Sequence, residues 1–112
     1  MKEVIHIEDG KHEGHITNMI REVRADFDYI DIYVELDDMK GEASIKTGFP
    51  AGISEKSTFG KFLISAGIDY QPKDKVSLKD VKARLIGRTI SFQTYTDNDF
   101  SNIMNKTIKF ED

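Results

Sequence analysis

The stretch Ser57-Thr-Phe-Gly-Lys-Phe-Leu-Ile-Ser-Ala-Gly67 decides the fold, because it interrupts a chain that otherwise has the pattern of strands. Its apolar residues recur at helical spacing and form one stripe of Phe59, Phe62, Leu63 and Ala66. Ser57 or Thr58 can accept a hydrogen bond from a free amide at the start, and Gly67 can adopt the left-handed conformation that ends a helix. A helix this short is unstable alone in water, so we expect the stripe to pack on an apolar surface.

Strands are predicted on both sides of this helix. Residues 29–36 alternate most clearly, with Ile30, Ile32, Val34 and Leu36 on one face and Tyr29, Asp31, Tyr33 and Glu35 on the other. We expect further strands at residues 14–24, 42–49, 85–96 and 102–110. The inward faces of the last three should hold Ala43, Ile45, Thr47, Phe49, Ile90, Phe92, Thr94, Met104, Ile108 and Phe110. Residues 14–24 do not alternate cleanly, which fits either a bent strand with a bulge or a short amphipathic helix.

The order of these elements predicts a mainly β fold. Three strands, one helix and two strands form the connectivity of the OB-fold, a five-stranded Greek-key barrel with one helix between strands 3 and 4. In this arrangement the helix closes the apolar opening at one end of the barrel. Residues 69–84 form a polar connection with room for one helical turn at 78–83. The rival architecture is an open antiparallel sheet with the helix on one face.

Length and composition indicate one globular domain over residues 1–112, in which residues 1–10 form an extra strand or a flexible end. The chain has 38% hydrophobic and 32% charged residues and a net charge of −4, so any contact with nucleic acid must depend on local positive charge. It contains no cysteine, which excludes disulfides and thiolate metal sites. The acids near Met1 do not fit a signal peptide, and no apolar run fits a membrane span, so we expect a cytoplasmic protein.

The motifs that usually indicate chemistry are incomplete in this chain. Gly60-Lys61 is followed by phenylalanine and lacks the spacing of a phosphate loop, so we expect that pair to serve packing. His12 and His15 would point to opposite faces of a strand and have no fourth ligand, so we expect no metal. No serine, histidine and acid form a nucleophile motif. The sequence therefore predicts neither an enzyme nor a cofactor.

The outward surface of the sheet is the remaining candidate site. Exposed aromatic rings beside cations are typical of proteins that bind single-stranded nucleic acid, because bases stack on rings while cations neutralise phosphates. The expected binding residues are Tyr29, Tyr33, Lys46, Arg88, Gln93, Tyr95, Phe100 and Lys109. The tyrosines would stack, and Lys46, Arg88 and Lys109 would neutralise phosphate. A protein interface on the same face is the alternative, and Asp31 and Glu35 on that face would repel phosphate.

A resemblance supports the nucleic-acid interpretation. Phe59-Gly-Lys-Phe-Leu-Ile-Ser-Ala-Gly67, Leu85-Ile-Gly-Arg-Thr-Ile-Ser-Phe and Asn102-Ile-Met together resemble small OB-fold proteins of phages and prophages. Those are single-stranded-DNA-binding proteins or proteins associated with replication and recombination. The resemblance implies sequence-tolerant binding of single-stranded DNA, or of RNA as the alternative strand, in replication, recombination or repair. The second interpretation is an OB-like interaction module without nucleic-acid binding, in which the face of Tyr29 and Tyr33 serves a homodimer contact or a replication protein as partner.

Overall fold

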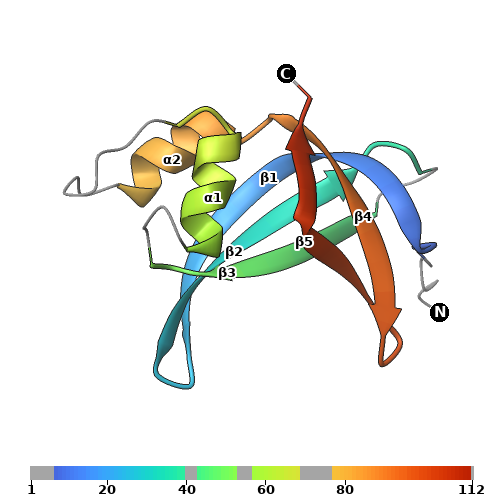
Figure 1. Cartoon of the computed structure of the whole chain (residues 1–112), viewed down its shortest axis with the longest axis horizontal. Coiled ribbons are helices and arrows are strands. Elements are labelled where there is room, and N and C mark those ends of the chain that lie inside the picture. Colours follow the sequence, from blue (N-terminus) through green and yellow to red (C-terminus); the bar gives the residue numbers. More distant parts are fainter. Residues whose placement is uncertain (1–6, 40–42, 53–56, 69–76, 112) are drawn as a thin grey trace.

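The computed structural model describes residues 7–39, 43–52, 57–68 and 77–111. These residues form one five-stranded antiparallel sheet and two short helices (Figure 1). In chain order the elements are β1 (Gly10–Arg24), β2 (Phe27–Leu36), β3 (Ser44–Pro50), α1 (Thr58–Ser65), α2 (Leu78–Leu85), β4 (Thr89–Asp97) and β5 (Phe100–Phe110). The strands lie in the order β3-β2-β1-β4-β5, so β1 is the centre of the sheet. None of the helices described is long and apolar enough to cross a membrane.

The central strand β1 bends the sheet into two arms. Its residues 14–24 pair with β2, whereas its residues 10–15 pair with β4. A register shift between Ile16 and Asn18 marks a bulge, which confirms the bent strand and excludes the amphipathic helix. From this bend the β1–β2 and β4–β5 hairpins extend to the same side of the molecule (Figure 1). The bend in β1 therefore leaves a space between the two hairpin arms.

The two edge strands of the sheet, β3 and β5, meet through side chains. The Thr47 hydroxyl donates to Asn105 Oδ1 at 2.5 Å, and Asn105 Nδ2 donates to the Gly48 carbonyl at 3.3 Å. No strand pairing joins β3 to β5 within the described residues. The prediction of a mainly β fold with five antiparallel strands is confirmed, and the sheet is open between its edges.

Helix α1 has the predicted sequence features. Ser57 Oγ accepts a hydrogen bond from the Gly60 amide at 3.0 Å, and Gly67 follows the helix with φ of +80°. The predicted stripe is buried against β3 and β5, and it consists of Phe59, Phe62, Leu63 and Ala66. The predicted burial of the stripe is confirmed, and we expect this packing to stabilise so short a helix.

The prediction of a single helix between strands 3 and 4 is wrong, because α2 follows α1. Val81 and Leu85 are one helical turn apart and are buried, and α2 lies on β1. The strand expected from residue 85 begins only at Thr89. Leu85 continues the apolar stripe of α2, although its neighbours along the chain have the composition of a strand.

The inward residue at the start of β5 is Ile103, not Met104 as predicted. Ile103 is buried, whereas Met104 is exposed. The register between β4 and β5 shifts between Ser91 and Gln93, so the alternation changes phase along β5. The Thr107 hydroxyl compensates there, because it accepts from the Gln93 amide at 2.8 Å and donates to the Met104 carbonyl at 2.6 Å.

The predicted extra strand at residues 1–10 lies mostly outside the described residues. Ile7 is buried in the core, and β1 begins at Gly10. Residues 69–76 of the polar connection also lie outside them. The inward residues of β2, β3 and β4 are buried as predicted except Thr47, which is half-buried and bonded to Asn105.

Gly14 is the point where β1 and β2 approach too closely for a side chain. A Cβ added there would lie 2.5 Å from the Glu35 carbonyl oxygen and 2.7 Å from Val34 Cγ1. We expect Gly14→Ala to lower the free energy of unfolding by about 1–3 kcal/mol, because the backbone must shift. Urea denaturation measures the change. Gly52→Ala is the matched control, since nothing lies within 4 Å of its added Cβ; equal losses in the two variants would contradict the prediction.

Candidate nucleic-acid interface

A polar cleft of about 220 Å³ lies between the two hairpin arms. It is lined by Arg24, Asp31, Lys46, Thr47, Gly48, Tyr95, Asn102, Ile103 and Asn105. These residues come from all five strands: β1, β2 and β3 form one wall of the cleft, and β4 and β5 form the other. The bend of β1 is what brings the two walls to face each other.

Two of the predicted binding residues line this cleft. Lys46 is exposed on β3, and Tyr95 is 40% exposed on β4. Tyr33 is the β2 partner of Lys46 and is half-buried beside it. Tyr29 is also half-buried, and the Arg24 guanidinium lies 5.4 Å from the centre of its ring. Tyr29 and Tyr33 therefore lie beside residues of the cleft, Arg24 and Lys46, but are not part of its lining.

The other predicted residues lie elsewhere. Gln93 and Lys109 are exposed on β4 and β5, outside the lining of the cleft. Arg88 is at the helix side, where its Nη1 donates to the Ala66 carbonyl at 2.6 Å and its guanidinium lies 4.5 Å from the centre of the Phe110 ring. Arg88 thus ties the end of α1 to β5, and the cleft does not include it.

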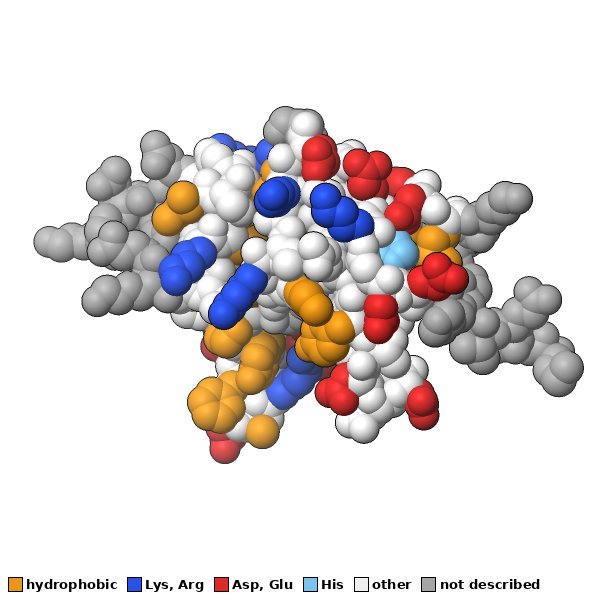
Figure 2. Space-filling model, turned by 45° about the vertical axis from the view of Figure 1, so that its right-hand side comes forward, with side chains coloured by type: hydrophobic (Ala, Val, Ile, Leu, Met, Phe, Trp, Pro, Cys, Tyr) orange, Lys and Arg blue, Asp and Glu red, His pale blue; other side chains and the backbone are white. Residues whose placement is uncertain are grey.

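Both hairpins carry an exposed phenylalanine at the turn. Phe27 is 66% exposed beside the β1–β2 turn, and Phe100 is 73% exposed beside the β4–β5 turn. The central residues of the two turns all have positive φ, between 47° and 71°, as in type I′ hairpins. In Figure 2, hydrophobic side chains gather in the lower left and centre of the view, Lys and Arg side chains lie above and among them, and Asp and Glu side chains lie mainly on the right. The turns therefore present two rings at the ends of the arms that flank the cleft.

A charged cluster forms one wall of the cleft. Arg24 Nη2 donates to Asp31 Oδ2 and, at 3.2 Å, to Glu22 Oε2. Asp31 is fully buried, and its Oδ1 accepts no hydrogen bond from the described residues. A Cβ on Gly48 would lie 2.9 Å from that oxygen, so glycine leaves the room that the carboxylate needs. The expectation that Asp31 faces outward and repels phosphate is wrong, because Arg24 covers and neutralises it.

This cluster lowers the pKa of Glu22 through a hydrogen bond with Asp31 and through the hydrogen bond and charge of Arg24. A carboxylate with a lowered pKa stabilises the fold above its unfolded pKa of about 4.3, and this contribution disappears as the pH falls through the folded pKa. We expect Glu22→Gln to reduce the melting temperature at pH 7, and we expect this deficit to shrink as the pH falls below about 4. Calorimetry across this range measures the difference, and a constant deficit at every pH would contradict the prediction.

The histidines make hydrogen bonds to carboxylates that are distant in the sequence. His12 Nδ1 lies 3.1 Å from Asp38, and His15 Nδ1 lies 2.8 Å from Asp37. No group of three or more His, Asp or Glu side chains in the described residues could hold a metal ion. The histidines join β1 to the chain after β2, which is a structural role.

Asn102 and Asn105 are residues that the sequence reasoning missed. Both line the cleft, and Asn105 also joins the two edges of the sheet. Simple alternation predicts Asn105 on the outward face of its strand, and the register shift between β4 and β5 brings it to the seam.

Models of known protein families, curated proteins and solved structures were compared with the chain, and none of them matches it.

Proposed function

We propose that this protein binds single-stranded DNA, without catalysis, in the cleft between its two hairpins. The observation that carries the proposal is the composition of this cleft: Lys46 supplies positive charge, Tyr95 supplies a ring, and Asn102 supplies an amide, while the charge of Arg24 is balanced by Asp31 and Glu22. The exposed rings of Phe27 and Phe100 flank it. Rings and cations along one groove suit a chain of bases and phosphates, and few directional groups suit binding that tolerates many sequences.

The architecture supports an OB-like interpretation of this cleft. The strand order β3-β2-β1-β4-β5, with a central β1 shared by both arms, is the order of a five-stranded OB barrel opened between β3 and β5. Helix α1 contacts both strands of this seam, as a helix that closes one end of a barrel would. OB-folds bind oligonucleotides through the face of strands 2 and 3 and the loops between strands 1–2 and 4–5. Those are the elements that surround this cleft.

Fluorescence anisotropy with labelled oligo-dT, at low and moderate salt, tests the proposal. We expect salt-sensitive binding, because phosphate contacts release counterions. Tyr95→Ala should weaken it by about 1–3 kcal/mol, which is roughly 5- to 150-fold, because one stacked base is lost. Lys46→Glu should also weaken oligo-dT binding, and the loss of affinity should be larger at low salt than at high salt.

Lys79→Glu is the matched control. Lys79 is exposed on α2, and this substitution changes the net charge by the same amount as Lys46→Glu. This variant should bind like the wild type. Equal effects of Lys46→Glu and Lys79→Glu would show that general charge, and not the cleft, governs the interaction. Oligo-U in the same assay distinguishes RNA from DNA.

Self-association is the second candidate function, and the exposed phenylalanines favour it. Large apolar side chains at both hairpin ends are typical of contact surfaces. Analytical ultracentrifugation over a concentration series should then show a dimer that Phe27→Ser and Phe100→Ser abolish. A monomer at all concentrations together with oligo-dT binding would leave the DNA function alone.

A further inference from the structure

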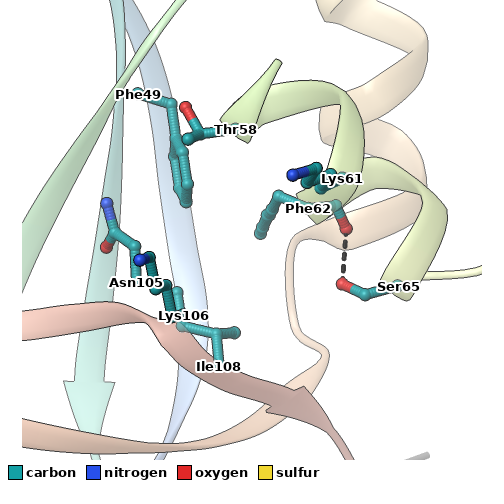
Figure 3. Close-up of a pocket in the computed structure, with 8 residues that line it drawn as sticks. All are labelled: Phe49, Thr58, Lys61, Phe62, Ser65, Asn105, Lys106 and Ile108. Carbon is teal, nitrogen blue, oxygen red and sulfur yellow. Dashed lines mark hydrogen bonds between the residues drawn. The ribbon is translucent and has the colours of Figure 1, made fainter. Parts of the chain in front are cut away.

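A second hollow lies on the other side of Asn105, between α1, β3 and β5 (Figure 3). Its volume is about 320 Å³, and its lining is Phe49, Thr58, Lys61, Phe62, Ser65, Asn105, Lys106 and Ile108. Small-ligand pockets are mostly apolar and measure about 300–1,000 Å³. This cavity lies at the lower end of that range, so it suits a ligand smaller than a drug-sized molecule.

The apolar walls of this cavity are held in place by neighbouring aromatic rings. The rings of Phe49 and Phe62 are 5.0 Å apart between centroids and meet edge to face at 69°. Phe62 also meets Phe110 edge to face, at 5.3 Å and 87°. Rings locked on two sides cannot turn into the hollow to fill it. The cavity is therefore preformed, and the ordering that an induced pocket would require is avoided.

The polar groups of the cavity favour an anion. Lys61 comes from α1 and Lys106 from β5, so the two ammonium groups reach the hollow from opposite walls (Figure 3). Its lining contains no acidic side chain, and neither lysine forms an ion pair with the residues that the structure describes. Two of the other polar groups are engaged, since Ser65 donates to the Phe62 carbonyl and Asn105 is bonded to β3.

We propose that this cavity is a binding site for a small amphipathic anion, with an aromatic or short alkyl body and one carboxylate or sulfonate. The body would lie against Phe49, Phe62 and Ile108. The acid group would lie at the opening between Lys61 and Lys106. This site is separate from the cleft of the proposed function, because Asn105 stands between them.

Titration with anilinonaphthalene sulfonate tests the site, since this dye combines aromatic rings with one sulfonate. Protein labelled at the isoleucine δ1 methyl groups is followed by NMR. We expect the Ile108 methyl signal to move and saturate, while Ile20 and Ile86, which are exposed elsewhere, stay unchanged. Equal shifts of all three signals would mean that the dye covers apolar surface in general, and would overturn the proposal.

Charge reversal provides the second measurement. Lys61→Glu with Lys106→Glu should weaken dye binding by about tenfold, because two attractions become repulsions. Lys11→Glu with Lys79→Glu is the matched control, with the same change of net charge at exposed lysines outside the cavity. The control pair should bind like the wild type. Equal affinities of the two double variants would refute the site, and thermal melting verifies that both are folded.

Discussion

Replacement of Phe62 by alanine is expected to lower the free energy of unfolding by about 3–5 kcal/mol, as is usual for a buried phenylalanine. Phe62 is the centre of an aromatic cluster: it lies 5.0 Å from Phe49, 5.3 Å from Phe110 and 6.3 Å from Phe59 between ring centroids. It joins α1 to both edge strands. Its loss therefore removes buried area and leaves a void that the neighbouring rings cannot fill.

Guanidinium denaturation gives the size of this effect, and Ile64→Ala is its control. Ile64 is on the same helix but is 54% exposed, so its truncation should cost less than about 1 kcal/mol. A similar loss for both variants would mean that helix propensity, and not packing of the stripe, holds α1. That outcome would contradict the account of the fold given above.

Arg24→Met is expected to cost about 3 kcal/mol, because it leaves the buried Asp31 carboxylate without its partner. The Asp31 side chain is 1% exposed, whereas that of Arg24 is 40% exposed. Water can therefore replace part of the interaction that the guanidinium makes with Asp31. The loss in the free energy of unfolding should lie at the lower end of the range for broken buried ion pairs. The double variant Arg24→Met with Asp31→Asn removes the charge as well, and should recover most of the stability.

Arg21→Met is the matched control for this second prediction. Arg21 pairs with Asp28 on the same two strands, but the side chains are 62% and 40% exposed, and such surface pairs contribute about 0–1 kcal/mol. Urea denaturation of the four proteins forms the comparison. If the double variant is no more stable than Arg24→Met alone, the loss of stability comes from the lost packing of the Arg24 side chain. The unpaired charge of Asp31 would then not be its cause.

The parts of the fold that could be predicted are those in which local pattern and tertiary packing agree. Residues 29–36 alternate and form β2, and the stripe of α1 is buried as its spacing indicates. Helix α2 could be anticipated only as one helical turn at 78–83, because its mean composition is polar and only Val81 and Leu85 are buried along it. Two apolar residues one turn apart are too weak a signal against a run of strand-forming residues beginning at Leu85.

The candidate site was predictable in part for a similar reason. Lys46 and Tyr95 follow the alternation of their strands and so reach the cleft. Asn105 depends on the register shift in β5, which arises from pairing between distant segments and has no local signature. The burial of Asp31 depends on Arg24 across the hairpin and on a glycine in β3. The position of Asn105 and the burial of Asp31 are both tertiary effects, and the sequence of a single strand does not predict them.

The amide of Asn105 has a mechanical consequence. Strands joined by a ladder separate only by breaking bond after bond, whereas β3 and β5 are fastened at two hydrogen bonds to one side chain. Rotation of that single side chain would break both hydrogen bonds without loss of any backbone pairing, and the contacts of Phe62 with Phe49 and Phe110 would then still join the two edge strands. Because the cleft and the cavity share Asn105 as a wall, we expect a change in its side-chain torsion to alter the width of both.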